Sequence, residues 1–322
     1  RDFCLSRGLG DVYKRQAVDS YIAKPSAETV ILNDKPFVFQ PEKTDLTKSL
    51  NGVFAFAGAE KWVFADHLLN VPMATIATTP AEAKNIEKEK IDAAKPAFKA
   101  YAEALKFMTE HAAGLKGHAS RGPELINAAN YGYDQTVQMF ADGNALFIQQ
   151  GNWAYSNIEK INPETAKNVS FIPLKMPFTD EMIQDGRTAE QINSSIIVTT
   201  GNYYAINAKV SEEQQKQAVE FLKWMEKEEN VQKWIIDSFK FIPYNVTPEM
   251  KLENPLSESI QKYLSAGQTF NDTVVGTPKT WSGEKVGTAL LEQYIGKEEW
   301  DDETLDQIAD LCVNSWKELK SE

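Results

Sequence analysis

Strand-like and helix-like segments alternate along the chain, and this alternation constrains the fold more than any other feature of the sequence. The compact apolar runs GVFAFAG (52–58) and ALFIQQG (145–151) are typical of buried strands. Further strands are expected at 170–178 and 203–207, and two short strands around a turn at 29–39. Amphipathic stretches lie between such runs. One is the region 80–113, which Thr79 can cap and Pro96 would break or kink, and another starts at Asn152 as its expected cap. The clearest is 211–239, where Ala218 and Leu222 share one helical face. Alternating strands and helices predict an α/β fold with largely parallel sheets.

The length of the chain points to two packed units. A chain of 322 residues is longer than a single hydrophobic core usually serves. No Ser/Gly-rich stretch separates two halves, so a flexible tether between them is not expected. We therefore expect two α/β lobes that are joined by crossing strands, as in a hinge.

Charge and composition narrow the range of partners. A net charge of −12 and an isoelectric point near 4.9 repel nucleic acid and anionic membrane surfaces, so neither is an expected partner. No apolar run approaches the ~18 residues that a membrane-spanning helix needs. Cys4 and Cys312 lie far apart in the sequence, and the three histidines show no ligand spacing. We expect these histidines at the surface or at helix ends, and we expect neither a metal nor a cofactor.

The first residues differ from the rest of the chain. Residues 1–16 (RDFCLSRGLGDVYKRQ) are basic in an otherwise acidic chain and show no helical or strand period. They resemble translated adapter sequence, so we expect a non-native segment and leave it out of the fold argument. A genuine basic N-terminal arm is the alternative.

No motif of a known catalytic class is present. The sequence contains no GxSxG, HExxH, GxxxxGK[ST] or GxGxxG pattern. A glycoside-active enzyme needs only two carboxylates that face each other in a cleft, and the chain has many carboxylates. This reading therefore stays open as an alternative, but the sequence favours a binding protein over an enzyme.

The positions of the tryptophans are the most informative chemical signal. Trp62, Trp153 and Trp281 lie in turn-like contexts beside polar residues, where loops at the carboxyl ends of parallel strands hold ligands. An indole there offers a rigid flat face to a pyranose ring, and polar neighbours can bond its hydroxyls. For each of the three, packing at the edge of a core is the competing explanation. Three further tryptophans fall inside amphipathic helices and are expected in the core: Trp224, Trp234 and Trp316.

Several segments also resemble a known family in consistent order. ALFIQQGNWAYSNI (145–158) resembles the maltose-binding-protein-like family-1 extracellular solute-binding proteins of carbohydrate ABC importers, in which an apolar strand ends in a Gly-x-Trp turn. The other segments that are similar to this family are 55–70, 133–145, 201–225, 239–249 and 273–297. Together they place the resemblance over about residues 50–322.

The resemblance implies a type II periplasmic-binding-protein fold of two α/β lobes with a ligand cleft between them. Residues 50–198 and 275–322 would form lobe 2, and residues 203–270 would belong to lobe 1. Residues 17–50 match the family poorly, so we expect them to be a partial lobe or hinge region. Over a hundred residues of the family's N-terminal lobe have no counterpart here, and we expect the first lobe to be incomplete.

The resemblance also implies a set of ligand-binding residues. It assigns stacking to Trp153 and Trp281, and places an acidic and an aromatic residue, Glu60 and Trp62, at the cleft. The full set of expected ligand-binding residues is Glu60, Trp62, Asn152, Trp153, Gly201, Asn202, Tyr203 and Trp281. Glu60 and Asn152 are expected to form hydrogen bonds, and Gly201 and Asn202 to lie at the lobe crossing.

The function that follows is capture of a sugar or oligosaccharide by hinge closure, and its delivery to the membrane subunits of an ABC importer. The protein would be a monomer, and either a membrane-anchored extracellular lipoprotein or periplasmic. A polyamine or other cationic ligand is the nearest rival, with carboxylates that would have to converge: Glu60, Asp66, Asp134 and Glu284. A surface adhesion protein without a small ligand is a third reading.

Overall fold

The computed structural model describes residues 29–32, 35–38, 48–114, 117–118, 121–199 and 204–320. The strands pair two by two. Antiparallel pairs are β1 (Thr29–Leu32) with β2 (Lys35–Val38) and β4 (Ala113–Gly114) with β5 (Gly117–His118). Parallel pairs are β3 (Gly52–Ala55) with β6 (Ala145–Ile148) and β7 (Ile196–Val198) with β8 (Thr269–Asn271). The predicted α/β character is present, and the two short strands predicted within 29–39 pair with each other, while the turn between them lies outside the described residues.

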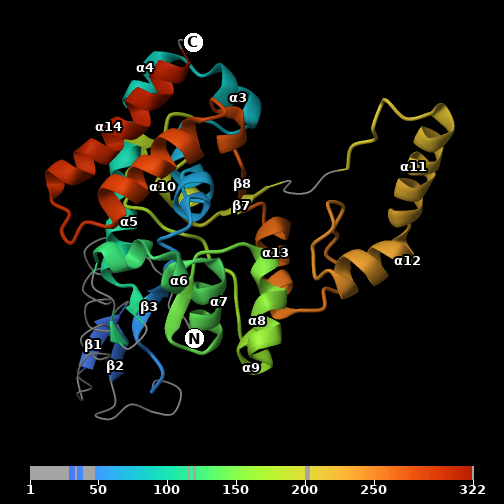
Figure 1. Cartoon of the computed structure of the whole chain (residues 1–322), viewed down its shortest axis with the longest axis horizontal. Coiled ribbons are helices and arrows are strands. Elements are labelled where there is room, and N and C mark those ends of the chain that lie inside the picture. Colours follow the sequence, from blue (N-terminus) through green and yellow to red (C-terminus); the bar gives the residue numbers. More distant parts are fainter. Residues whose placement is uncertain are drawn as a thin grey trace.

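Helices surround these strands (Figure 1). The longer ones are α3 (Pro80–Asn85), α4 (Lys88–Ala93), α5 (Lys95–Glu110), α7 (Tyr133–Ala141), α8 (Tyr155–Ile161), α10 (Ala189–Asn193), α11 (Glu212–Met225), α13 (Pro255–Ser265) and α14 (Asp302–Leu319). Short or irregular helical segments are η1 (Val63–His67), α2 (Asn70–Met73), η2 (Pro123–Ile126), α6 (Ala128–Tyr131), η3 (Asn152–Ala154), α9 (Pro163–Ala166), η4 (Asp180–Met182), α12 (Glu228–Asn230), η5 (Val231–Ser238), η6 (Val274–Gly276), η7 (Trp281–Gly287) and η8 (Leu290–Ile295).

The main core lies between β3 and the helices α5 and α14, which pack side by side. Phe98 on α5 meets Trp281 at a ring distance of 6.0 Å, and Trp281 meets Trp316 on α14 at 4.9 Å. All three side chains are fully buried. Burial of large aromatic side chains is a main source of folding free energy, so this cluster anchors the body of the molecule.

A second core joins α7, α8 and α13 to strand β7. Val137 of α7, Ile158 of α8 and Ile260 of α13 are buried in it. The helix α13, which the sequence assigns to lobe 1, therefore packs here against elements assigned to lobe 2. The division of the chain into 50–198 with 275–322 and 203–270 stays a prediction.

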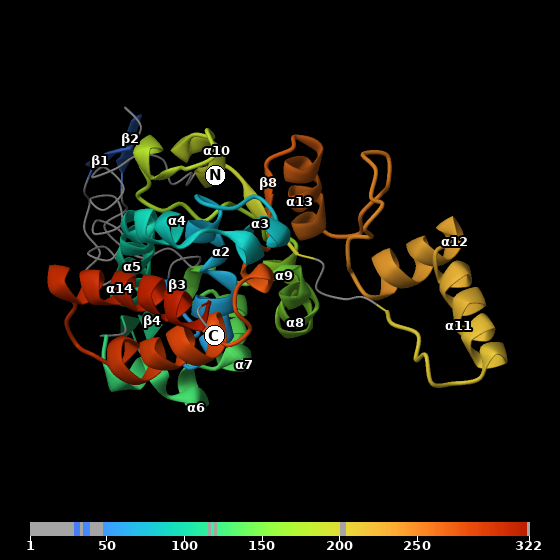
Figure 2. The same cartoon turned by 90° about the horizontal axis from the view of Figure 1, so that it is seen from above.

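Helices α11 and α12 form an arm that lies apart from the body in both views (Figures 1 and 2). Its apolar cluster is small and centres on Val231, Ile236 and Leu252. No residue of α11 is buried, and Trp224 and Trp234 are 41% and 38% exposed. The expectation that these two tryptophans pack in a core is therefore wrong in this structure, whereas Trp316 is buried as expected.

Some predicted elements form and others do not. The helical region 80–113 is divided into α3, α4 and α5, and Thr79 caps α3 by accepting a hydrogen bond from the backbone N–H of Glu82 at 3.2 Å. Pro96 lies in the first turn of α5 and so starts a helix rather than kinking one. The predicted strand at 170–178 is absent, and 204–207 is irregular where a strand was expected. Among the helices described, none has the length and apolar character needed to cross a membrane.

Candidate functional site

Parallel strands place several polar and aromatic residues at their carboxyl ends, where α/β proteins bind ligands. Strand β3 leads through Gly58 to Glu60, and its partner β6 leads to Gly151 and Trp153. Strands β7 and β8 likewise lead to Thr199 and Asp272, and Thr199 is the last described residue before the gap at 200–203. The topology therefore brings the ends of sequence-distant strands into one region.

Four rings come together at this edge, and we call them the aromatic cluster: Trp62, His67, Tyr133 and Trp153. The indole of Trp62 lies 4.9 Å from His67, 5.9 Å from Tyr133 and 6.3 Å from Trp153, measured between ring centroids. His67 lies 5.1 Å from Trp153. All four side chains are half-buried, so each is packed on one side and reaches solvent on another.

Glu60 holds the cluster in place. One carboxylate oxygen, Oε2, accepts a hydrogen bond from Trp62 Nε1 at 2.9 Å. The other, Oε1, accepts from the backbone N–H of Tyr133 at 3.1 Å. Glu60 therefore fixes the Trp62 ring and links the loop after β3 to the start of α7. These two hydrogen bonds give Glu60 a positioning role.

The turn after β6 sets the position of Trp153. A Cβ at Gly151 would lie 2.1 Å from Cζ3 of the indole, so only glycine lets the ring lie against the backbone here. Trp153 Nε1 donates to Gln150 Oε1 at 3.3 Å. Asn152 was expected to cap the following helix, but Gly151 occupies the cap position and no side chain caps it. Asn152 is half-buried beside the cluster residue Trp153.

Asn70 links two of the strand-end segments. Its side chain is buried, with 1% exposed. Oδ1 accepts from the backbone N–H groups of Thr273 at 2.8 Å and Val274 at 3.0 Å, while Nδ2 donates to the carbonyl of Asp66 at 3.0 Å. Asn70 thus fixes the loop that carries Asp272 against the helical turn that carries Asp66 and His67.

Two carboxylates, those of Asp66 and Asp272, lie close enough to His67 to act on it by their charge. Burial lowers the pKa of His67, and the negative charges of Asp272 and Asp66 oppose that shift only in part. The imidazole is therefore neutral at pH 7 and can both donate and accept a hydrogen bond. Asp66 Oδ1 accepts from Ser282 Oγ at 2.6 Å, which anchors that carboxylate to η7.

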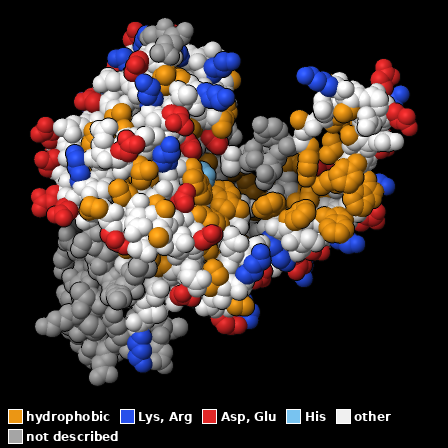
Figure 3. All heavy atoms as spheres, in the orientation of Figure 1, with side chains coloured by type: hydrophobic (Ala, Val, Ile, Leu, Met, Phe, Trp, Pro, Cys, Tyr) orange, Lys and Arg blue, Asp and Glu red, His pale blue; other side chains and the backbone are white. Residues whose placement is uncertain are grey.

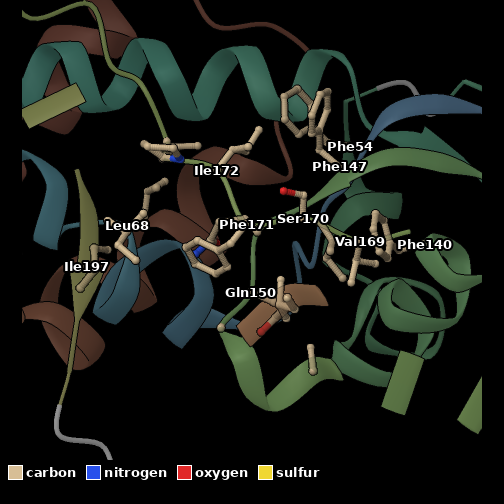
Figure 4. A pocket seen from close by; sticks show the side chains of 18 of the residues that line it. Phe54, Leu68, Phe140, Phe147, Gln150, Val169, Ser170, Phe171, Ile172 and Ile197 are labelled. Carbon is tan, nitrogen blue, oxygen red and sulfur yellow. The ribbon is translucent and has the colours of Figure 1, made fainter. Parts of the chain in front are cut away.

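A cavity of about 180 Å³ adjoins the cluster (Figure 4). Phe54 and Phe147 lie at one end and Leu68 and Ile197 at the other, and Gln150 forms part of the wall between the cavity and Trp153. The lining is mostly apolar. This cavity occupies the space beside 170–174, where the predicted strand does not form.

The structure brings together only part of the predicted site. Trp62 and Trp153 meet in the aromatic cluster, and Glu60 is hydrogen-bonded to Trp62. Trp281 does not: its side chain is 0% exposed, and its Nε1 donates to the carbonyl of Cys312 at 2.9 Å. An indole enclosed in this way has no face for a sugar ring, so Trp281 is a core residue, and we withdraw the expectation that it stacks on ligand.

Other residues that the sequence predicts for the site lie outside the described ranges or apart from the aromatic cluster. Gly201, Asn202 and Tyr203 fall outside the described residues. Among the carboxylates named for a cationic site, Asp134 and Glu284 are exposed. Within the described ranges, no group of three or more His, Cys, Asp or Glu side chains is arranged to hold a metal ion.

Three residues of the site were not expected from the sequence: His67, Tyr133 and Asp272. His67 lies five residues after Trp62 at the end of the same irregular helical segment, and Asp272 directly follows β8. The position of His67 and Asp272 in the sequence could have indicated them, since both follow strand ends or turns that the sequence predicts. Residue type alone gave no signal, because a lone histidine or aspartate is more often an ordinary surface residue.

Residues 41–283 match the family model described as bacterial extracellular solute-binding protein. No curated protein sequence matches the chain. Among solved structures, the chain is similar to MsmE, a candidate binding protein of Bacillus subtilis subsp. subtilis str. 168 in an open conformation, with a TM-score of 0.51 and 19% identity. The match covers 85% of this chain and 60% of that chain, so this chain spans about 60% of the length of that neighbour. The likeness shows the two-lobed α/β fold.

Proposed function

Since the chain belongs to the family of bacterial extracellular solute-binding proteins, we propose that it captures a sugar or oligosaccharide. The observation that carries this proposal is the aromatic cluster, in which Trp62 and Trp153 lie 6.3 Å apart beside His67. Flat faces of this kind bind the apolar face of a pyranose, while neighbouring polar groups bind its hydroxyls. Closure of two lobes around the bound sugar would follow from contacts that the ligand makes with both.

The site favours binding over catalysis. Both carboxylate oxygens of Glu60 already accept hydrogen bonds from groups that position the cluster. A glycoside hydrolase needs a pair of carboxylates that face the scissile bond. We therefore propose a binding protein, and turnover of an oligosaccharide by the purified chain would contradict that proposal.

The sugar proposal is tested by thermal unfolding against a panel of mono- and oligosaccharides. A ligand that binds only the folded state raises the melting temperature, by the equivalent of about 2.7 kcal/mol at a hundredfold excess over Kd. We expect a rise with one class of sugar and its loss in Trp153→Ala. Trp224→Ala is the matched control, because that indole is half-exposed on the arm and lies outside the cluster. A rise that survives in Trp153→Ala would remove the cluster from the site.

A cationic ligand such as a polyamine is the second candidate. The charges of Asp66 and Asp272 act on His67 at the edge of the cluster, and aromatic faces also bind cations. Salt separates the two candidates, because binding of a cation weakens as ionic strength rises whereas binding of a neutral sugar changes little.

The cellular role follows as part of the same proposal. The protein would work outside the cytoplasm, as a periplasmic protein or as a lipoprotein anchored at the cell surface. It would act as a monomer, and its closed form would dock on the membrane subunits of an ABC importer. Uptake of the labelled sugar by cells with and without the gene tests this role.

A further inference from the structure

Asp272 carries a carboxylate that the protein satisfies on one side only. Oδ2 accepts a hydrogen bond from Thr199 Oγ1 at 3.0 Å, and the backbone N–H of Asp272 donates to the carbonyl of Val198 at 3.1 Å. Oδ1 is buried and has no hydrogen-bond partner among the described residues. A buried carboxylate oxygen without a partner lowers stability, so its presence calls for an explanation outside the folding of the chain.

The surroundings of Asp272 place this residue near the aromatic cluster. Asn70 fixes residues 273 and 274 against the carbonyl of Asp66, next to His67 in the chain. Asp272 is near enough to His67 for its charge to act on the imidazole. Since Thr199 donates to the carboxylate and Asn70 holds residues 273 and 274, which follow it, Asp272 is fixed before any ligand arrives.

His67 is also held in place, and its ring nitrogens have no protein partner among the described residues. Its ring packs against the indoles of both Trp62 and Trp153, with centroid distances of 4.9 and 5.1 Å. Neither ring nitrogen is hydrogen-bonded to another residue of the described ranges. A neutral imidazole and a carboxylate in the same region offer one donor and several acceptors to groups that lie over the indoles.

We infer that Asp272 and His67 bind ring hydroxyls of the stacked sugar and decide which sugars the site accepts. This inference rests on the proposed function and adds the residues that give it specificity. A site built to bond a hydroxyl strongly rejects an analogue that lacks it, because its polar groups are then left unpaired. The aromatic cluster provides contact area, and Asp272 and His67 discriminate among sugars of similar shape.

The test compares stability and affinity in the same variant. In Asp272→Asn the unpaired charge is removed and the shape is kept, so we expect the unliganded protein to melt at the same or a higher temperature. We expect the best sugar of the panel to bind about 10- to 100-fold more weakly, as for loss of a hydrogen bond to a charged group. The matched control is Asp142→Asn, an exposed aspartate that also accepts one side-chain hydrogen bond, from Gln138 at 2.9 Å.

A second experiment changes the ligand instead of the protein. Monodeoxy analogues of the best sugar are titrated into wild type, Asp272→Asn and His67→Phe, the last of which keeps an aromatic ring against both indoles. We expect wild type to reject at least one analogue by 100-fold or more and both variants to reject it far less.

The outcomes are distinct. If wild type binds no sugar in the panel, the proposed function fails and this inference falls with it. If wild type binds but Asp272→Asn and His67→Phe show unchanged affinity and the same preference among analogues, the inference alone is overturned. If Asp272→Asn melts at a markedly lower temperature and the variants keep the wild-type preference, the carboxylate has only a structural role.

Discussion

At the scale of single residues, Gly151 controls where the Trp153 indole lies. A methyl group at this position would meet the ring at 2.1 Å, far inside van der Waals contact. We expect Gly151→Ala to displace the indole and to weaken sugar binding about tenfold or more, measured by calorimetric titration, because stacking depends on ring position. Gly283→Ala is the control, since its Cβ would approach Asp66 no closer than 3.5 Å. Equal affinity in both variants would show that the indole does not contact the ligand.

The same scale shows what the sequence predicts well and what it does not. Turn-like contexts at strand ends correctly brought Glu60, Trp62 and Trp153 to one region. Trp281 has a similar local context, yet its ring enters the core against Phe98 and Trp316. Local sequence does not reveal which way a ring beside a turn points, because the partners that bury it come from helices far away in the chain.

At the scale of elements, Asn70 is the contact that joins the loop after β8 to the segment η1. Its three hydrogen bonds serve buried backbone groups, and unpaired buried groups cost about 1–3 kcal/mol each. We expect Asn70→Ala to lower the free energy of unfolding by about 2–4 kcal/mol in urea titration. Asn85→Ala is the control, because its one hydrogen bond, to the carbonyl of Ala81, is exposed. A loss no larger than in the control would contradict this role.

Helices were predicted more reliably than strands. Capping residues such as Thr79 and Ser211 lie next to the helices they start, so the information is local. A strand requires a partner from elsewhere in the chain, and the apolar run at 170–178 pairs with no strand of the described ranges. Met176 and Phe178 of this run are buried whereas Ile172 is exposed, so the apolar pattern did not determine pairing.

At the scale of the whole molecule, the arm exposes large apolar side chains of the kind that are buried in the body. Hydrophobic atoms gather on the arm across the hollow from the body (Figure 3). Phe221 is 55% exposed, whereas Phe98 is fully buried. We expect Phe221→Ser to change the free energy of unfolding by less than about 0.5 kcal/mol and Phe98→Ser to lower it by about 3–5 kcal/mol, both measured in urea. A large effect at Phe221 would mean that another surface covers the arm in solution.

The buried pair Trp281 and Trp316 has an optical consequence. These indoles are sealed in the core, 4.9 Å apart, and a ligand at the strand ends does not touch them. Their emission should stay at short wavelength and resist a quencher added to the solvent. Trp62 and Trp153 are half-exposed, so their emission should shift when a sugar covers them. The protein thus contains both a constant reference and a reporter of occupancy, and fluorescence can follow binding without any added label.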